Sequence, residues 1–435
     1  MPIRILLFYA LPALPLAALT LPLYIIVPTF YTETLGLPLA SVGAALLFVR
    51  VFDAVNDPAI GWLSDRWRPR GGRRRMLFLA SLPVAALAAL MLFWPPAGAG
   101  TLYLAFWAAV LSLGFTGAML PYSAWGAELA GGYGARARVT GWREAFTLAG
   151  TLMAIALPFA IGFETVDGPH GLAVLGVAVA AGLLVAGGLA VAMVPEPREH
   201  SIARLDLRDG LRAMAANRPF LRLIAAYFLN GLANGIPATL FLYFVSDRLG
   251  APDMRGPLLF LYFLSGIVGV PLALAASARM GKHRAWCVAM MVNCAAFSLV
   301  PLLGTGDVLA FAAICAATGL LLGFDLSLPP AIQADVIDFD TAESGEQRSG
   351  AYFAAWGLSI KLSLALGVGL VFPLLGFLGF EAGGGNGEEA VGALVALYVW
   401  PPIALKACAI ALMWNFPLDE AAQSALRGRI EARVA

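Results

Sequence analysis

Long apolar segments separated by short polar stretches follow one another along the whole chain. Twelve of these segments reach the length of about 20 residues that an α-helix needs to cross a lipid bilayer. They lie at residues 5–31, 40–63, 76–95, 101–129, 139–163, 171–194, 218–247, 255–278, 285–304, 307–333, 349–377 and 390–416. The pattern therefore predicts an all-α membrane protein with twelve transmembrane helices.

The composition agrees with this interpretation and excludes several functional classes. Hydrophobic residues make up 60% of the 435 positions and charged residues only 13%, whereas soluble domains carry about 25% charged residues. A formal net charge of +1 excludes nucleic-acid binding driven by overall basicity. The sequence has no Gly-x-x-x-x-Gly-Lys-Ser/Thr phosphate-binding motif, and its four cysteines and three histidines are too dispersed for a zinc site. We therefore expect neither an enzyme nor a bound cofactor.

Positively charged residues lie mostly on one side of the predicted membrane. With both termini placed in the cytoplasm, the cytoplasmic loops and ends hold 22 of the 28 lysines and arginines, and the opposite side holds 2. The other four lie inside spans. Because cytoplasmic loops carry an excess of lysine and arginine, we predict a multi-pass protein of the inner (cytoplasmic) membrane with both termini in the cytoplasm.

Two pairs of similar segments relate the halves of the chain. Residues 30–36 (FYTETLG) resemble 244–250 (FVSDRLG), and residues 121–128 resemble 329–335. The offset of about 210 residues predicts two related six-helix bundles with a substrate site near the bilayer midplane. The predicted parts are a first bundle at 1–194, a cytoplasmic linker with an amphipathic helix at 195–217, a second bundle at 218–416 and a cytoplasmic tail at 417–435.

The second predicted span contains a group of polar residues. Asp53 and Asp57 lie four positions apart and therefore on one face of the helix. Asp53 is about 18 Å from the start of the span, near the middle of the bilayer. With the amide oxygen of Asn56 and the carbonyl freed by Pro58, the carboxylates predict a site for a hard cation such as Na⁺ or for a proton. The alternative is a structural Arg50–Asp53 ion pair, which leaves Asp57 unexplained.

Other charged residues within spans are candidates for function, because a charge inside the membrane is costly. Lys361 is expected near mid-membrane in the eleventh span, as a partner for Asp53 or Asp57 when no cation is bound. Snorkelling to the interface is the alternative for this lysine. We expect Lys361 and Arg50 to couple the binding of the cation with the transport of the substrate. Lys406, in the last span, is expected to pack or to snorkel.

Several residues are candidates for a substrate cavity. Arg143, at the start of the fifth span, either faces the cavity or pairs with an acid in a loop. Asp325, in the tenth span, has no partner nearby in sequence and is favoured as a cavity-facing residue. Further candidates for the substrate cavity are Tyr122, Trp125, Asn230 and Asn234.

The loop after the second span combines a glycine, an acid and clustered arginines, which predicts a charge latch on the cytoplasmic side. The alternative is that the arginines only set the topology. The residues assigned to this cytoplasmic gate are Gly61, Asp65, Arg66, Arg73 and Arg74.

The latch segment resembles a motif of the major facilitator superfamily. More narrowly, the chain resembles the glycoside–pentoside–hexuronide:cation symporters, the melibiose permease family, in residues 52–58 (FDAVNDP), 121–128 (PYSAWGAE) and 334–339 (ADVIDF). Arg143 and Lys361 match as well. The resemblance implies that Asp53, Asn56, Asp57 and Thr116 are cation ligands, that Lys361 is the coupling lysine and that Arg143 lies in the substrate cavity.

One departure from the resemblance concerns the substrate. Melibiose-type members hold sugar hydroxyls with acids in the first and fourth spans, whereas residues 12–18 and 117–120 contain no acid here. We expect a monomeric secondary transporter, coupled to Na⁺ or H⁺, that imports a small polar solute, glycoside-like or another organic substrate, by alternating access. Its partners are this solute, the cation and the lipid bilayer. The alternatives are a sodium-coupled transporter of lysolipids or other amphiphiles, a proton-driven exporter and, more remotely, a membrane receptor without transport activity.

Overall fold

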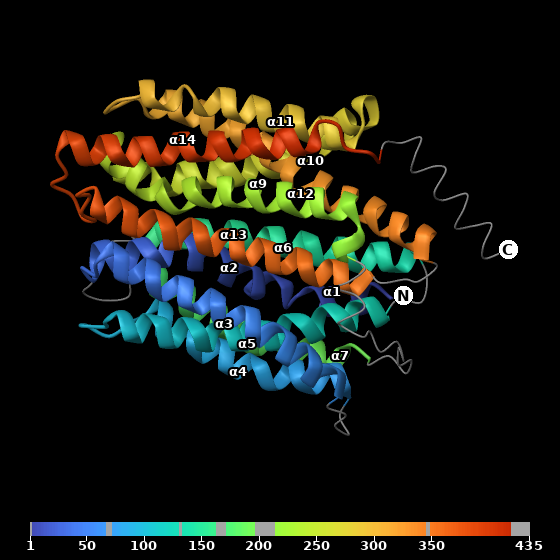
Figure 1. Ribbon diagram of the computed structural model, residues 1–435. Coiled ribbons are helices and arrows are strands. Elements are labelled where there is room, and N and C mark those ends of the chain that lie inside the picture. Colours follow the sequence, from blue (N-terminus) through green and yellow to red (C-terminus); the bar gives the residue numbers. More distant parts are fainter. Residues whose placement is uncertain are drawn as a thin grey trace. The chain divides into compact units, whose positions relative to one another are not determined.

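The computed structural model describes residues 2–66, 72–129, 133–161, 171–195, 214–344 and 349–418, and their regular elements are helices (Figure 1). In the first half these are Ile3–Ala10 (α1), Ala13–Thr29 (α2), Phe30–Thr34 (η1), Leu39–Arg66 (α3), Arg73–Phe93 (α4), Thr101–Leu129 (α5), Tyr133–Ile161 (α6) and Gly171–Met193 (α7). In the second half they are Arg218–Tyr243 (α9), Phe244–Arg248 (η2), Pro252–Met254 (η3), Arg255–Met280 (α10), Lys282–Phe297 (α11), Val300–Leu302 (η4), Val308–Ser344 (α12), Ser349–Phe377 (α13) and Glu388–Met413 (α14).

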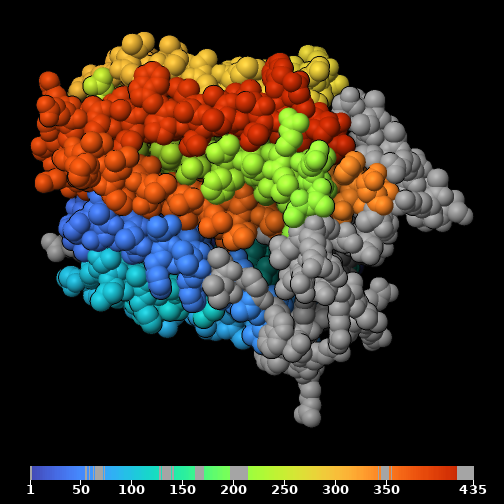
Figure 2. Space-filling model, in the orientation of Figure 1, coloured from blue at the N-terminus to red at the C-terminus, as the bar shows by residue number. Residues whose placement is uncertain are grey.

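These helices confirm the all-α membrane fold. Among the described residues, eleven helical segments are long and apolar enough to cross a membrane. The remaining predicted span, 40–63, corresponds to α3, a helix of 28 residues. Large apolar side chains such as Leu102, Phe106 and Leu309 are exposed, as expected for contact with lipid. Side chains of the described helices form most of the face seen in Figure 2.

Two predicted loops are shorter than the sequence indicated. The apolar pattern ended the tenth span at residue 333, but α12 continues to Ser344 with Pro329 and Pro330 inside it. Likewise, α6 begins at Tyr133 within the predicted polar loop that reaches residue 138. Hydropathy shows where the apolar environment ends, whereas a helix continues for as long as its backbone hydrogen bonds do. Prolines are tolerated in such helices because neighbouring groups satisfy the freed backbone.

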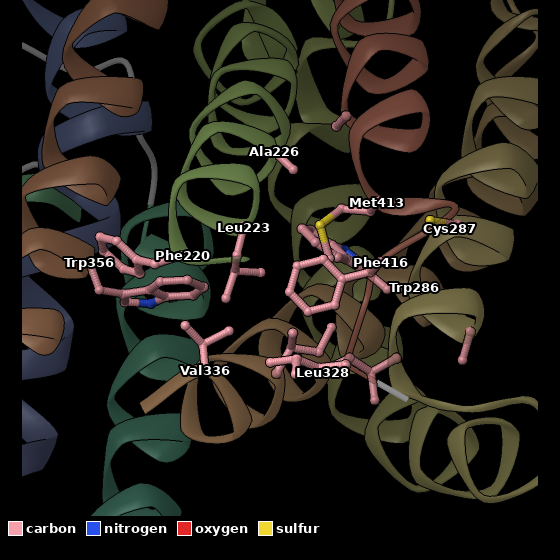
Figure 3. Close-up of a cluster of buried hydrophobic side chains, with 14 of the residues drawn as sticks. Phe220, Leu223, Ala226, Trp286, Cys287, Leu328, Val336, Trp356, Met413 and Phe416 are labelled. Carbon is pink, nitrogen blue, oxygen red and sulfur yellow. The ribbon is translucent and has the colours of Figure 1, made fainter. Parts of the chain in front are cut away.

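The chain divides into two compact units. Unit 1 comprises Met1–Ser201 with Phe372–Gly385, and unit 2 comprises Ile202–Val371 with Asn386–Ala435. The predicted amphipathic helix lies outside the described residues except for 214–216, and so does the tail after residue 418. In unit 2, a buried cluster with Phe220, Trp286 and Phe416 among its members forms an apolar core (Figure 3).

The paired segments 30–36 and 244–250 have the same local structure. Each contains a five-residue π-helix, Phe30–Thr34 in unit 1 and Phe244–Arg248 in unit 2. Each then reaches a glycine with positive φ, which is 70° at Gly36 and 65° at Gly250. This conformation favours glycine because it has no Cβ. The similarity of the two sequences is thus matched by a similarity of backbone.

Helices α10 and α12 approach closely at Gly323, and we expect a side chain there to destabilise unit 2. A Cβ added at Gly323 would overlap the backbone of Gly269 and lie 2.5 Å from the nitrogen of Val270. Gly323→Val should therefore lower the free energy of unfolding by about 1–3 kcal/mol, the usual cost of overpacking. The measurement is the melting temperature in detergent. Gly392→Ala in α14 is the control, because its Cβ meets no described atom within 4 Å, and equal melting temperatures would contradict the expectation.

Candidate functional site

The first polar group lies on α3, where Arg50 and Asp53 form a buried ion pair. Arg50 Nη1 is 2.6 Å from Asp53 Oδ2, and the Asp53 side chain is only 1% exposed. The Arg50 guanidinium also lies over the ring of Tyr24 on α2, 4.2 Å from its centroid, in a cation–π contact. The ion pair that was the alternative interpretation of these residues is therefore present, and it occupies one carboxylate oxygen of Asp53.

Asp57 lies one helical turn further along the same face and is held from another helix. Thr116 on α5 donates a hydrogen bond from Oγ1 to Asp57 Oδ1 at 2.9 Å. Asn56, which precedes Asp57 in the sequence, is buried. Its Nδ2 has no hydrogen-bond partner within the described part of the chain. The structure thus brings Thr116 to Asp57, and their assignment as cation ligands stays a prediction.

The donor atoms of this group define what it can bind. Arg50 forms an ion pair with Asp53, and Asp57 adds a second carboxylate one turn away, next to the hydroxyl of Thr116. Carboxylate and hydroxyl oxygens are hard ligands. Such oxygens suit a proton or a hard cation, whose positive charge offsets carboxylate charge in a low-dielectric environment.

Tyr122 and Trp125 lie in the packed interior of unit 1. The rings of Tyr9 and Tyr122 stack with centroids 4.8 Å apart. Each hydroxyl donates to the other residue's carbonyl oxygen, at 3.1 Å from Tyr9 and 2.7 Å from Tyr122. Trp125 donates from Nε1 to the carbonyl oxygen of Pro195 at 3.0 Å. Both predicted cavity residues are fully buried, so their polar groups serve the packing of unit 1, and contact with a substrate stays a prediction.

Arg143 pairs with its neighbour in sequence. Its Nη2 is 2.8 Å from Glu144 Oε1, and its side chain is 24% exposed. The acid partner is therefore on the same helix, α6, rather than in a loop. Arg143 remains accessible on one side, and its assignment to a substrate cavity stays a prediction.

The second polar group lies inside unit 2 and joins four helices. Asp325 on α12 accepts hydrogen bonds from Asn234 Nδ2 on α9 at 2.8 Å and from Trp286 Nε1 on α11 at 2.6 Å. Lys406 on α14 donates from Nζ to Asn230 Oδ1 at 2.7 Å and lies 3.8 Å from Asp325 Oδ2. Of the predicted substrate-cavity residues, the structure brings Asp325, Asn230 and Asn234 together.

Of the two outcomes expected for Lys406, packing and snorkelling, the structure shows packing. Its side chain is only 3% exposed, so it lies inside unit 2 and does not snorkel to an interface. The reason is that Asn230 and Asp325 provide a hydrogen bond and a counter-charge in the interior. Sequence reasoning also missed Trp286, whose indole N–H gives no signal in an apolar segment. The charge of Lys406 within a span was a signal, but it did not identify a partner.

The remaining predicted residues are described only in part. Lys361 lies half-buried on α13 within unit 2, and its pairing with the acids of α3 stays a prediction. In the gate segment, the side chains of Asp65, Arg66 and Arg73 lie outside the described residues.

The two remaining gate residues are described. Arg74 is buried at the start of α4. A Cβ added at Gly61 meets no described atom within 4 Å, and the role of this glycine in a latch stays a prediction.

The fold and these membrane-buried polar groups define a multi-pass membrane transporter of the major facilitator type. Residues 8–420 match the model of a family described as MFS/sugar transport protein. The chain belongs to this family, which confirms the superfamily predicted from the motifs. It is a transporter and not an enzyme.

Relatives and solved structures agree with this assignment. The inner membrane symporter YicJ of Escherichia coli is 25% identical, with 86% of this chain and 82% of that protein covered. The isoprimeverose transporter of Lactiplantibacillus pentosus is 24% identical, with 86% and 80% covered. The fold is similar to the crystal structure of a D-xylose-proton symporter, with a TM-score of 0.68, 15% identity and 96% and 98% coverage.

Proposed function

We propose that this transporter imports a sugar-type solute together with a monovalent cation, Na⁺ or H⁺, across the inner membrane. The observation that carries the proposal is the geometry of the α3 group, where two carboxylates lie one helical turn apart and the hydroxyl of Thr116 donates to Asp57. The names of the relatives support it, since one is a symporter of the inner membrane and another transports a sugar.

The coupling follows from charge. An ionised Asp57 without a bound cation carries a desolvation penalty in any conformation that closes this group from water. A bound cation removes that penalty, so the loaded carrier changes conformation more readily than the empty one. A cation that binds one state more tightly shifts the equilibrium by its differential affinity. Lys361 is the proposed residue that takes the place of the cation in the empty carrier.

The proposal is tested with the purified protein in proteoliposomes. Uptake of labelled neutral sugars, uronates and lysophospholipids is measured under an inward Na⁺ gradient, an inward H⁺ gradient and no gradient. We expect accumulation of a sugar-type solute above its external concentration under one cation gradient and only equilibration without a gradient. Accumulation of the lysophospholipid alone, proton-driven efflux, or no flux of any solute would each contradict the proposal. The predicted cytoplasmic location of both termini is tested by labelling each terminus from either side of the membrane.

A further inference from the structure

Unit 2 contains a polar centre that the cation chemistry of α3 does not use. Asp325 lies inside α12, and two donors from different helices are directed at its two oxygens, Asn234 Nδ2 at Oδ2 and Trp286 Nε1 at Oδ1. Trp286 is fully buried in the apolar cluster of Figure 3, which holds its indole in place. A carboxylate fixed from both sides in this way is preorganised, because the supporting side chains are themselves locked by packing.

Lys406 supplies the charge that balances Asp325 without occupying its oxygens. The 3.8 Å between Lys406 Nζ and Asp325 Oδ2 is too long for a hydrogen bond. The ammonium instead donates to Asn230 Oδ1 at 2.7 Å. Its charge therefore acts on Asp325 through space, and the carboxylate keeps its capacity to accept further hydrogen bonds.

The carboxylate has unused acceptor sites, and it is accessible. An ionised carboxylate offers about four lone-pair positions, and described donors use two of them. The Asp325 side chain is 14% exposed, whereas that of Lys406 is 3% exposed. Asn234, beside it, is half-buried and adds a carbonyl oxygen as a further acceptor. The partly exposed members of the centre are thus a carboxylate and an amide, whereas the ammonium is buried.

We propose that Asp325 and Asn234 form a hydroxyl-binding subsite for a neutral polyhydroxylated solute, with Lys406 as the buried counter-charge that sets this preference. The proposal rests on the proposed function and names the kind of substrate. Hydroxyl groups donate to a carboxylate and form charge-assisted hydrogen bonds with it. The positive charge of Lys406 repels a cation at this position, and the negative charge of the partly exposed Asp325 repels an anionic solute. A hydrocarbon chain would leave the carboxylate desolvated without a partner.

The test separates a ligand role from a structural role with a double variant. Asp325→Asn alone leaves Lys406 buried without a counter-charge, and Lys406→Met alone does the same to Asp325, so either single variant can fail to fold. The double variant Asp325→Asn/Lys406→Met removes both charges together. We measure binding of D-xylose, D-glucose, cellobiose and D-glucuronate in detergent by calorimetry, and folding by the melting temperature.

We expect the parent protein to bind at least one neutral sugar at least about tenfold more tightly than D-glucuronate. The double variant should melt near the parent but bind that sugar at least about tenfold more weakly, as for the loss of a charge-assisted hydrogen bond. The control is Lys282→Met/Asp335→Asn, which removes another ion pair between α11 and α12, with Nζ 2.7 Å from Oδ2. This control should bind the sugar as the parent does.

Three results would overturn the subsite. These are parent-like binding by the double variant, no binding of any neutral sugar by the parent, and tighter binding of D-glucuronate than of the neutral sugars. A failure of the proposed function has a different signature. In that case the parent still binds a neutral sugar through Asp325 but does not accumulate it under either cation gradient.

Discussion

Replacing Asp57 with asparagine is expected to abolish cation-driven accumulation while the protein still folds and inserts. Asparagine keeps the shape of the side chain, and its carbonyl oxygen can accept the hydrogen bond that Thr116 donates to Asp57 at 2.9 Å. What is lost is a full negative charge. A unit charge about 4 Å from a cation contributes roughly 4 kcal/mol at an effective dielectric constant of about 20. Cation affinity should therefore fall by a factor on the order of 10²–10³.

The measurement is the ratio of internal to external labelled sugar in proteoliposomes, with and without an inward Na⁺ or H⁺ gradient. The Asp57→Asn variant should bring the sugar only to equilibrium under either gradient. Asp307→Asn is a control for loss of one carboxylate, because Asp307 is exposed and, among the described residues, its side chain accepts a hydrogen bond from the backbone of Gly304. If Asp57→Asn accumulates the sugar as the parent does, α3 does not hold the coupling cation.

The sequence was sufficient to predict most of the fold, because lipid imposes a simple rule. Every backbone group within the bilayer must be satisfied internally, so long apolar segments become helices. The described residues supply a helix for each predicted span. The ends of helices were less predictable, as the extension of α12 to Ser344 shows. Polar residues can continue a helix beyond the membrane, and hydropathy does not detect this.

The candidate sites were predictable to the extent that they are local in sequence. Asp53 and Asp57 share a helix face because of their spacing, and the costs of burying charge identified them as functional candidates. The centre at Asp325 depends on residues from α9, α11, α12 and α14. Its assembly follows from tertiary packing, which a single sequence does not reveal. Lys406 was therefore recognised as a charge within a span but not as the counter-charge of Asp325.

Replacing Arg50 with methionine is expected to destabilise unit 1 and to make its stability depend strongly on the coupling cation. Methionine is similar in length but carries no charge, so the variant loses both the 2.6 Å ion pair with Asp53 and the cation–π contact with Tyr24. Removing one partner of a buried ion pair costs about 3–5 kcal/mol, because the remaining charge is left uncompensated. In the absence of a bound cation, the melting temperature should therefore fall well below that of the parent.

A cation should recover much of this loss, because it can take the position from which Arg50 compensates Asp53. A ligand that binds only the folded state at about 100 times its Kd stabilises it by about 2.7 kcal/mol. The measurement is the rise in melting temperature on adding NaCl, with choline chloride as the control for ionic strength. Arg50→Met should show a larger Na⁺-specific rise than the parent, and the double variant Arg50→Met/Asp53→Asn should regain stability without a comparable rise.

Equal rises in the parent and Arg50→Met would show that Asp53 is reserved for the ion pair and that the cation does not reach it. The comparison of Arg50→Met with Asp57→Asn therefore distinguishes two cation sites. If both carboxylates hold the cation, the Na⁺-specific rise in melting temperature depends on Arg50. If Asp57 alone holds it, that rise is the same with and without Arg50.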